Sequence, residues 1–359
     1  MEQNKNYCVI MAGGIGSRFW PLSTQKFPKQ FQDILGTGRT MIQQTYDRIS
    51  KLIPDENIFV ITNKDYTALT HNQLPNIPVD NIVGEPLMKN TAACNIFMVN
   101  KIADICPDAN IVVLPADHLI LKEEVFLQKI NLAFDLVSKN DYLVTLGIQP
   151  TRPDTGYGYI QYLGEEGKAI FKVKTFTEKP NLEIAKSFLE SGDFLWNAGI
   201  FIWNAKTIKT SFQEFLPEMS QQFSYCEYNS DNEATCIETI YPKVAKISID
   251  NGILEKAQNV YVIPADLGWS DLGTWTSVYE NAEKDEVENS IDSKMVFTYN
   301  SSRNIIRIKN NKAAIIDGLE DYIIVDTDKA LLICPRSNDQ LIKDYVLDLK
   351  SVKKGDKFM

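Results

Sequence analysis

The sequence has little histidine, no excess of basic residues and no long hydrophobic run. Its two histidines, His71 and His118, are too few for a histidine-rich metal site and leave little for a histidine-centred catalytic triad. The formal net charge is -10, so attraction to nucleic acid or to an anionic membrane by bulk charge is not expected. No run approaches the length of a membrane span, and residues 1–7 contain no apolar signal-peptide core. These absences predict a cytoplasmic protein.

Two further signals are missing. The six cysteines, Cys226 and Cys236 among them, form no Cys-x-x-Cys pair, so we expect buried, reduced thiols. No string matches the P-loop pattern G-x-x-x-x-G-K-[ST], and the dinucleotide fingerprint G-x-G-x-x-G fails because Phe19 stands at its third glycine position. What is present is ordinary for a globular protein, with 44% hydrophobic and 23% charged residues.

Strand-like and helix-like segments alternate in the first half of the chain. This rhythm predicts an α/β domain that binds its ligands at the carboxyl ends of buried strands. The expected strands are 7–11, 58–62, 111–114 and 142–147, and the expected helices are 41–53, 91–105 with Thr91 as its cap, and 126–137.

The second half is richer in strands. We expect β-rich segments in 156–203 around a helix at 182–191, then a helix at 205–223 and a strand near 261–263. After residue 287, short aliphatic runs are separated by Asn, Asp and Gly turns, which predicts a few coils of a β-helix closed by a helix at 338–349. The expected domains are therefore 1–287, the catalytic part, and 288–359, a small β-rich appendage.

The stretch VIMAGGIGSRFWPLSTQKFPKQF, residues 9–31, places glycines directly after a strand. Gly13, Gly14 and Gly16 would allow a tight turn and let backbone N–H groups approach an anion without interference from a Cβ. Arg18 and Lys29 add positive charge in an acidic chain. The alternative is an ordinary βα turn with solvated cations, but the pattern favours a phosphate-binding loop.

The same stretch resembles the signature of sugar-1-phosphate nucleotidylyltransferases, and its Phe19-Trp20 form is similar to the mannose-1-phosphate guanylyltransferase branch. Further strings that resemble this family follow in the family's order and extend the resemblance over residues 9–275. They are EPLMKNTAA, LPADH, GYGYI, FTEKP, WNAGIFIW, SIDNGILEK and GWSDLGTW.

The resemblance implies a fold and a reaction. The fold would be a Rossmann-like (GT-A-like) mixed sheet flanked by helices. In the reaction, an oxygen of mannose 1-phosphate would attack the α-phosphorus of GTP with the help of Mg²⁺, and pyrophosphate would leave. A homodimer without nucleic-acid or membrane partners is expected. The alternatives are another nucleotide and sugar pair, or a non-catalytic homologue that binds sugar nucleotides. The isomerase domain of the long bifunctional members is not expected.

The resemblance also assigns roles to residues. Asp117 and Asp271 would coordinate Mg²⁺, an ion that prefers oxygen ligands, although an Asp in the place of Asp117 is often only a helix cap. A plain helix cap is also the alternative for Asn90 and Thr91, and loop flexibility alone could explain the glycines of GYGYI. The remaining assignments are nucleotide binding by Ala12, Gly13, Gly14, Gly16, Asn90 and Thr91, catalysis by Arg18, Lys29 and Lys179, and sugar binding by Gly156, Tyr157, Glu178, Lys179, Asn197 and Gly199.

Overall fold

The computed structural model describes residues 5–164, 168–309 and 312–358. The chain packs into two compact units. Unit 1 contains the chain up to residue 13 and residues 45–116 and 120–269, and unit 2 contains residues 14–44, 117–119 and 270 to the C-terminus. This division differs from the expected boundary after residue 287, because residues 14–44 and 117–119 pack with the C-terminal part of the chain.

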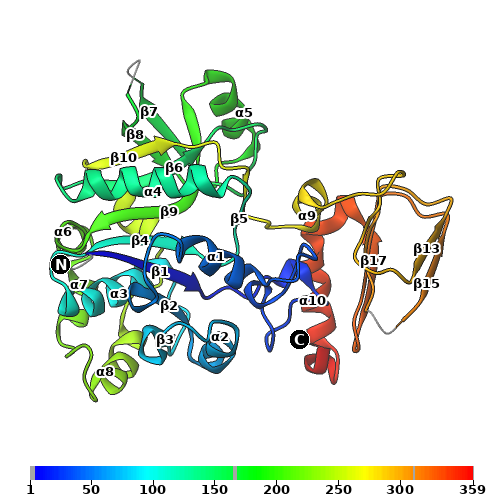
Figure 1. Cartoon of the computed structure of the whole chain (residues 1–359), viewed down its shortest axis with the longest axis horizontal. Coiled ribbons are helices and arrows are strands. Elements are labelled where there is room, and N and C mark those ends of the chain that lie inside the picture. The colour runs from blue at the N-terminus through cyan, green and yellow to red at the C-terminus, as the bar shows by residue number, and fades with distance from the viewer. Residues whose placement is uncertain (1–4, 165–167, 310–311, 359) are drawn as a thin grey trace. The chain divides into compact units, whose positions relative to one another are not determined.

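Unit 1 is built on a nine-stranded mixed sheet (Figure 1). The strand order is β3-β2-β1-β4-β9-β6-β10-β8-β7. Strands β1 to β4 run parallel, and β9 is antiparallel to both β4 and β6. The bounds are β1 Asn6–Ala12, β2 Ile58–Asn63, β3 Ile82–Glu85, β4 Asn110–Pro115, β6 Leu143–Ile148, β7 Tyr159–Leu163, β8 Phe171–Thr177, β9 Phe194–Asn204 and β10 Val260–Pro264.

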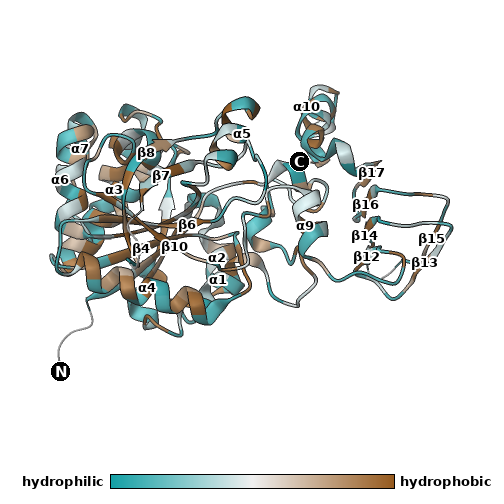
Figure 2. Ribbon diagram, turned by 90° about the horizontal axis from the view of Figure 1, so that it is seen from above, coloured by the Kyte–Doolittle hydropathy of each residue, from teal (hydrophilic) through white to brown (hydrophobic). Residues whose placement is uncertain are grey.

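Helices cover both faces of this sheet, and Figure 2 shows the apolar strands lying between them. Helices α3, α6 and α7 lie on one face, where Phe97, Phe212 and Phe223 join Trp203 of β9 in one buried cluster. Helices α1 and α4 lie on the other face (Figure 2). The bounds are α1 Met41–Ile49, α2 Thr67–Gln73, α3 Thr91–Ile105, α4 Glu123–Val137, α5 Leu182–Ser191, α6 Ala205–Phe215, α7 Pro217–Ser224 and α8 Glu233–Ile240.

Two of the expected helices differ from the structure. The expected helix at 205–223 is two helices, α6 and α7, which meet at Leu216. Pro217 begins α7, because proline lacks the N–H that would continue α6 but fits the first position of a new helix. Helix α1 ends at Ile49 and not at residue 53. The expected helix at 182–191 is confirmed as α5, with the Asn181 side chain capping it.

In unit 2 the C-terminal part coils into parallel strands. Strand β12 pairs with β14, β14 with β16, and β13 with β15, all in parallel, and β17 closes the sheet in antiparallel pairing with β16. The buried side chains of Asn289 and Asn304 link successive coils: Asn304 Nδ2 donates to Asn289 Oδ1 at 3.0 Å, and the Tyr322 N–H donates to Asn304 Oδ1 at 2.8 Å. The bounds are β12 Ser290–Ile291, β13 Val296–Tyr299, β14 Ile305–Arg307, β15 Ala314–Asp317, β16 Tyr322–Asp326, β17 Leu331–Pro335, α9 Trp275–Asn281 and α10 Ile342–Ser351. The expected β-rich, β-helix-like appendage is confirmed.

The coils have a small core of their own, around Ile306, Ile316 and Ile324, and they share a second core with the segment that follows the glycines. Ile305, Ile323 and Val325 are buried in one cluster with Phe19 and Trp275. The rings of Phe19 and Trp275 lie 5.1 Å apart. The segment that follows the glycines and the C-terminal coils are therefore two parts of one packed body.

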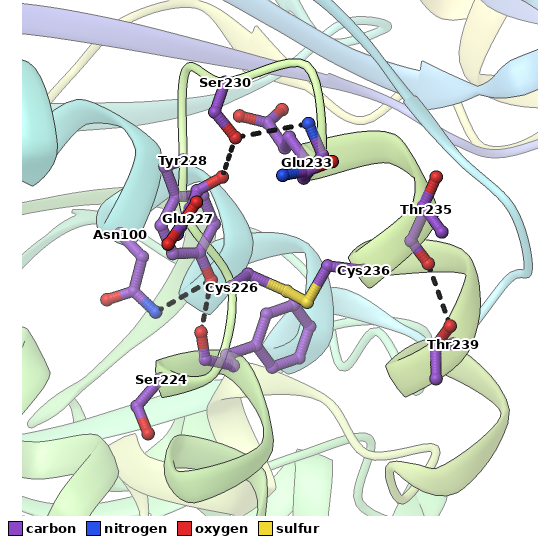
Figure 3. The surroundings of a disulfide bond; sticks show 12 residues. Asn100, Ser224, Cys226, Glu227, Tyr228, Ser230, Glu233, Thr235, Cys236 and Thr239 are labelled. Atoms are coloured by element: carbon purple, nitrogen blue, oxygen red, sulfur yellow. Dashed lines mark hydrogen bonds between the residues drawn. A yellow bond between two sulfur atoms is a disulfide. The ribbon is translucent and has the colours of Figure 1, made fainter.

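The cysteine prediction is wrong for one pair. Cys226 and Cys236 form a disulfide that ties the end of α7 to α8 (Figure 3). Inside the loop that it closes, the Tyr228 hydroxyl donates to the carbonyl oxygen of Phe223 at 2.7 Å. Spacing could not show this pair, because ten positions separate the two residues and only the α7–α8 turn brings them together. The other four cysteines are buried free thiols.

Candidate active site

Lys29 is the centre of a charged cluster in unit 2. Its side chain is only 4% exposed, and its ammonium group donates to Asp117 Oδ2 at 2.9 Å, to the Asp117 carbonyl oxygen at 3.1 Å and to the Asp271 carbonyl oxygen at 2.8 Å. It also lies 5.4 Å from the centre of the Phe19 ring. An ammonium group has three donors, so Lys29 is fully hydrogen-bonded. Binding a phosphate would require an exchange of these partners.

Gly16 is the glycine that Lys29 requires. Its φ is +72°, and a Cβ added there would lie 2.4 Å from the Cβ of Lys29. A Cβ on Gly14 would meet nothing within 4 Å, and one on Gly13 would meet only the Glu85 carboxylate at 4.0 Å. The fold therefore explains Gly16 but not Gly13 or Gly14, whose bare backbones remain open to a ligand.

Arg18 lies in the short 3₁₀ turn Ser17–Phe19 and is half-buried. Its Nε atom is buried and has no hydrogen-bond partner among the residues that the structure describes. A buried guanidinium nitrogen without an acceptor is costly. An anion that binds here would supply the missing acceptor, which agrees with the expected role of Arg18.

Asp117 and Asp271 both contact Lys29, but in different ways. Asp117 follows β4 and offers its carboxylate, whereas Asp271 offers its backbone carbonyl and uses its own carboxylate to accept the Gly273 N–H at 2.9 Å. Burial acts to raise the pKa of Asp117, but the charges of Lys29 and His118 outweigh it and hold that pKa below the ordinary value. Asp117 is therefore an ionised carboxylate in a cationic environment.

The two aspartates suit magnesium by donor chemistry. Their carboxylates are hard oxygen ligands, and Mg²⁺ usually takes one or two carboxylates and completes its shell with water and phosphate oxygens. The position of the Lys29 ammonium shows that a cation is stabilised beside Asp117. Within 5–164, 168–309 and 312–358, no three His, Cys, Asp or Glu side chains gather as a protein-only metal site. Asp117 and Asp271 supply two carboxylates of the kind that Mg²⁺ accepts.

In unit 1, Glu85 is a buried acid beside the glycine loop that the sequence analysis did not single out. It ends β3 and is buried, with its Oε1 accepting the Tyr241 hydroxyl at 2.8 Å. Burial raises the pKa of Glu85 to about 7, against an opposing effect of this hydrogen bond. Its Oε2 is the atom nearest to a Cβ built on Gly13. The available signal was the position of Glu85 at the carboxyl end of a strand, first in the string EPLMKNTAA.

The N-terminus of α3 uses several of its own polar groups. Asn90, and not Thr91, is the cap: its side chain accepts the Thr91 N–H at 2.8 Å, and its φ is 69°. The Thr91 hydroxyl oxygen accepts the Ile249 N–H at 2.9 Å, and the Ala92 N–H donates to the Ile247 carbonyl at 3.2 Å. The plain-cap interpretation thus describes Asn90, while nucleotide binding by Asn90 and Thr91 stays a prediction. At the end of β1, the carbonyl oxygen of Ala12 accepts a hydrogen bond from the Thr62 hydroxyl at 2.7 Å.

Glu178 and Lys179 follow β8 as a pair. Lys179 Nζ lies 2.8 Å from Glu178 Oε1, and the lysine side chain is 62% exposed. The backbone of Lys179 has a φ of 45°, a left-handed conformation that is uncommon outside glycine. A Cβ on Gly158 would lie 2.6 Å from Glu178 Oε2, so Gly158 admits this carboxylate. The N–H of Gly156 donates to Asp154 Oδ1 at 2.8 Å, and a Cβ on Gly156 would lie only 3.1 Å from the same oxygen, so the loop itself favours glycine there.

Asn197 and Gly199 lie on the same strand, β9. Asn197 Oδ1 accepts the Thr145 hydroxyl and the Gly199 N–H, both at 3.1 Å, and Asn197 Nδ2 donates to Asp250 Oδ1 at 3.0 Å. Gly199 has a φ of 68°, close to the irregular pairing of β9 with β6. The structure therefore brings Asn197 and Gly199 together with Asp250, which the sequence analysis did not name.

Tyr157 is an aromatic wall near this group. It is buried, and its ring meets Trp196 and Trp269 edge-on at 5.0 and 5.1 Å. The guanidinium carbon of Arg152 lies 5.9 Å from the Tyr157 ring centre and 5.4 Å from that of Trp196. Tyr157 is therefore held in a packed aromatic cluster.

Asp250 begins a one-turn π-helix, Asp250–Leu254. Burial raises the pKa of Asp250 to about 7, and the charge of Glu178 adds to this effect, while Lys179 and Asn197 oppose it. Short π-helical turns are frequent at functional sites. The string SIDNGILEK contains Asp250, but nothing in the sequence shows that it meets Asn197.

Comparison with known proteins agrees with these features. The nucleotidyl transferase family model matches residues 7–288. A mannose-1-phosphate guanylyltransferase of Salmonella muenchen is 35% identical over 97% of this chain and 74% of its own length, and one of Klebsiella pneumoniae is 33% identical with the same coverage. The crystal structure of a mannose-1-phosphate geranyltransferase from Thermus thermophilus matches with a TM-score of 0.86 at 27% identity, over 97% of this chain and all of that one.

In the described part of the chain, no helix is long and apolar enough to cross a bilayer. The family match covers both the glycine loop and the strings that follow it, and the similar proteins extend over the C-terminal coils as well. The chain belongs to the nucleotidyl transferase family and, within it, to the mannose-1-phosphate guanylyltransferases.

Proposed function

We propose that this protein transfers GMP from GTP to α-D-mannose 1-phosphate and so forms GDP-mannose and pyrophosphate. The similarity to curated guanylyltransferases supports the reaction class. The observation that carries the base assignment is the buried Glu85 carboxylate, whose Oε2 is directed toward Gly13. Guanine has two adjacent donors, the ring N1–H and the exocyclic amine, and a carboxylate accepts both. Uracil and thymine present carbonyl oxygens beside their single N–H, which a carboxylate would repel.

The sugar and its phosphate are assigned to the Glu178 group of unit 1. Glu178 and Asn197 would bind ring hydroxyls, and the exposed Lys179 ammonium would bind the phosphate that attacks. Orienting this phosphate for in-line displacement requires no covalent intermediate on the protein. The packed ring of Tyr157 would exclude water from one side of the sugar.

The charged groups of unit 2 are assigned to the triphosphate. Arg18 and Lys29 would hold the phosphates that leave as pyrophosphate, and Lys29 would exchange its carbonyl and carboxylate acceptors for phosphate oxygens. Asp117 and Asp271 would hold Mg²⁺, which would supply neutralisation of charge on the phosphates when bound. The depressed pKa of Asp117 keeps this carboxylate ionised for that purpose.

We also propose a cytoplasmic homodimer. Support for self-association comes from an exposed apolar patch on paired strands of unit 2, where Phe297, Tyr299 and Ile315 are 49%, 55% and 74% exposed. Sedimentation of the purified protein would test this proposal, and a monomer at micromolar concentration would contradict it.

The reaction is tested with a panel of nucleoside triphosphates against several sugar 1-phosphates, with release of pyrophosphate as the readout. We expect GTP with mannose 1-phosphate to give the highest kcat/KM. A preference of more than about tenfold for UTP or dTTP, equivalent to about 1.4 kcal/mol, would refute the base assignment. No turnover with any pair, combined with tight binding of a sugar nucleotide, would indicate a non-catalytic homologue.

A further inference from the structure

Asp250 has no role in the proposed function as stated above, yet it lies inside the sugar-binding group. It is half-buried in unit 1, and its Oδ1 accepts the Asn197 amide at 3.0 Å. Glu178 and Lys179 act on it electrostatically from the end of β8, with opposite signs. Asp250 is thus a second carboxylate beside Glu178 and Asn197, which the proposed function places on the sugar.

The Asn197 amide has one orientation in this group. Its oxygen accepts two donors, the Thr145 hydroxyl and the Gly199 N–H, so its nitrogen must face Asp250. That hydrogen bond occupies Asp250 Oδ1. A carboxylate has about four acceptor positions, so Asp250 keeps capacity to accept further donors after it binds Asn197.

The chain segment before Asp250 is fixed from a second direction. The Ile249 N–H donates to the Thr91 hydroxyl at 2.9 Å, and the Ile247 carbonyl accepts the Ala92 N–H at 3.2 Å. The Asp250 backbone is therefore held by the first turn of α3, while its side chain is held by β9. A group tied from two elements is preorganised to bind a ligand at little cost in ordering.

A second acid beside Glu178 is costly to the free protein. Burial and the nearby Glu178 charge raise the pKa of Asp250 to about 7, so its ionised form is disfavoured until donors arrive. Lys179 offsets only part of this cost, and its ammonium is paired with Glu178 Oε1 at 2.8 Å. The hydroxyls of a sugar are donors of the kind that would relieve two adjacent acids.

We propose that Asp250 is a substrate-binding residue that, together with Glu178, recognises the ring hydroxyls of the hexose 1-phosphate. The two acids accept hydroxyls at different ring positions, and Asn197 keeps Asp250 in place. This inference rests on the proposed function for the identity of the sugar. The rival role is purely structural, in which Asp250 serves only as the acceptor for Asn197.

The test compares Asp250→Asn with the unchanged protein. This variant keeps an acceptor oxygen for Asn197. It removes the negative charge and replaces the second carboxylate oxygen with an amide NH₂ group, which donates hydrogen bonds and does not accept them. We expect the KM for mannose 1-phosphate to rise about tenfold, as for a hydrogen bond to a charged group, while the KM for GTP changes less than about twofold. Asp193→Asn is the matched control, because Asp193 precedes β9 in the same unit and pairs with Gln161.

Deoxy analogues of mannose 1-phosphate distinguish direct contact between Asp250 and the sugar from a purely structural role of Asp250. At one ring position, removal of the hydroxyl should lower kcat/KM of the unchanged protein by about tenfold and that of Asp250→Asn by less than about threefold. Glu178→Gln should lose its sensitivity at a different position. If Asp250→Asn shows the same KM values and the same loss with every analogue as the unchanged protein, Asp250 does not contact the sugar. If Asp250→Asn does not fold, as judged by thermal melting, the same cycle is run with Asp250→Ser.

Failure of the proposed function is a separate result. If the unchanged protein does not turn over GTP and mannose 1-phosphate, calorimetric titration with GDP-mannose measures the same variants without catalysis. Binding that weakens about tenfold in Asp250→Asn but not in Asp193→Asn supports the inference. Equal binding by all three proteins refutes it.

Discussion

The two units hold their site residues in different ways. In unit 1, the polar atoms of Asn197 and Thr91 are fixed by hydrogen bonds with neighbouring elements, one of them to the Asp250 carboxylate. In unit 2, Lys29 and Asp117 neutralise each other, and the Arg18 Nε has no acceptor within the described part of the chain. Unit 1 thus presents side chains whose hydrogen bonds are already made, whereas in unit 2 Lys29 would have to exchange its acceptors to bind a phosphate.

The packing below the two sites differs as well. The unit 1 groups are attached to the ends of strands in a nine-stranded sheet. The Lys29 ammonium lies over the ring of Phe19, which shares its core with Ile305 and Ile323 of the C-terminal coils. The coils therefore support a charged loop of the site and are not an independent addition. We expect changes in unit 2 to act mainly on kcat and changes in unit 1 mainly on KM.

The largest effect is expected for the acidic residues of unit 2. Asp117→Asn or Asp271→Asn should lower kcat by on the order of 10²–10³, similar to the loss of one preorganised electrostatic group. The double variant should be little worse than either single one if both residues serve one ion. Steady-state kinetics at limiting Mg²⁺ measures this.

Thermal melting of the same variants separates a fold defect from a metal defect. Full activity of Asp271→Asn at limiting Mg²⁺ would show that the two carboxylates do not share an ion, and the contrast between the units would lose its main support.

The next largest effect concerns the stability of unit 1. Replacing both Cys226 and Cys236 with Ser should lower the free energy of unfolding by about 2–3 kcal/mol, the entropic value for a short closed loop. We expect kcat to be unchanged, because the bridge ties α7 to α8 and neither sulfur belongs to the assigned site residues. Urea titration with and without a thiol reductant measures the effect.

In a cytoplasm that reduces exposed disulfides, the unbridged form would be the working state. A reductant that leaves the unfolding curve of the unchanged protein unaltered would argue against the bridge in solution.

Gly16→Ala should affect unit 2 with a smaller cost. The new Cβ would force a positive φ on a non-glycine residue and would lie 2.4 Å from the Lys29 Cβ, so Lys29 must move. We expect a loss of about 2 kcal/mol in the free energy of unfolding and a lower kcat, because a displaced Lys29 would no longer hold the leaving phosphates. Gly14→Ala is the stability control, because a Cβ there meets nothing. Equal unfolding curves for the two variants would contradict this role of Gly16.

The smallest effect is a pH dependence in unit 1. Burial raises the pKa of Glu85 from 4.5 to about 7, so between these values the folded protein holds a proton that the unfolded chain releases. The contribution of Glu85 to stability is full below about pH 4.5 and is lost as pH rises through 7. Glu85→Gln should therefore become more stable than the unchanged protein by about 1–2 kcal/mol between pH 5 and pH 8. A pH-independent difference in Tm would exclude this explanation.

Glu85→Gln also tests the base assignment. An amide cannot accept both guanine donors, so the KM for GTP should rise, while the KM for mannose 1-phosphate should not change. A rise in both KM values would indicate a general defect of unit 1.

Much of the fold could be predicted from local patterns. The apolar runs at 58–62 and 111–114 became β2 and β4, and the periodic stretch at 182–191 became α5 with its Asn181 cap. The prediction of one helix at 205–223 was wrong, because its apolar period continues through Leu216 although Pro217 ends the hydrogen-bond ladder. Periodicity reports which side is buried, and it does not report where the backbone breaks.

The site could be predicted in part. Glycines after a strand and the order of the motifs pointed to Lys29, Asp117 and Asp271, and the structure brings these three together in unit 2. Glu85 and Asp250, which join the site only as proposals, were not singled out, because a lone acid in sequence has no visible partner. Their pKa values depend on burial and on Tyr241 or Asn197, which are far away along the chain.

The sequence by itself determined the elements and the family, because strand and helix patterns, turn glycines and ordered motifs are local properties of the chain. Only the tertiary structure decided which groups share an environment. It placed residues 14–44 on the core of the C-terminal coils, paired Cys226 with Cys236, and set Asp250 against Asn197. Burial and pairing arise when distant segments pack, and these set the charge and the freedom of each side chain.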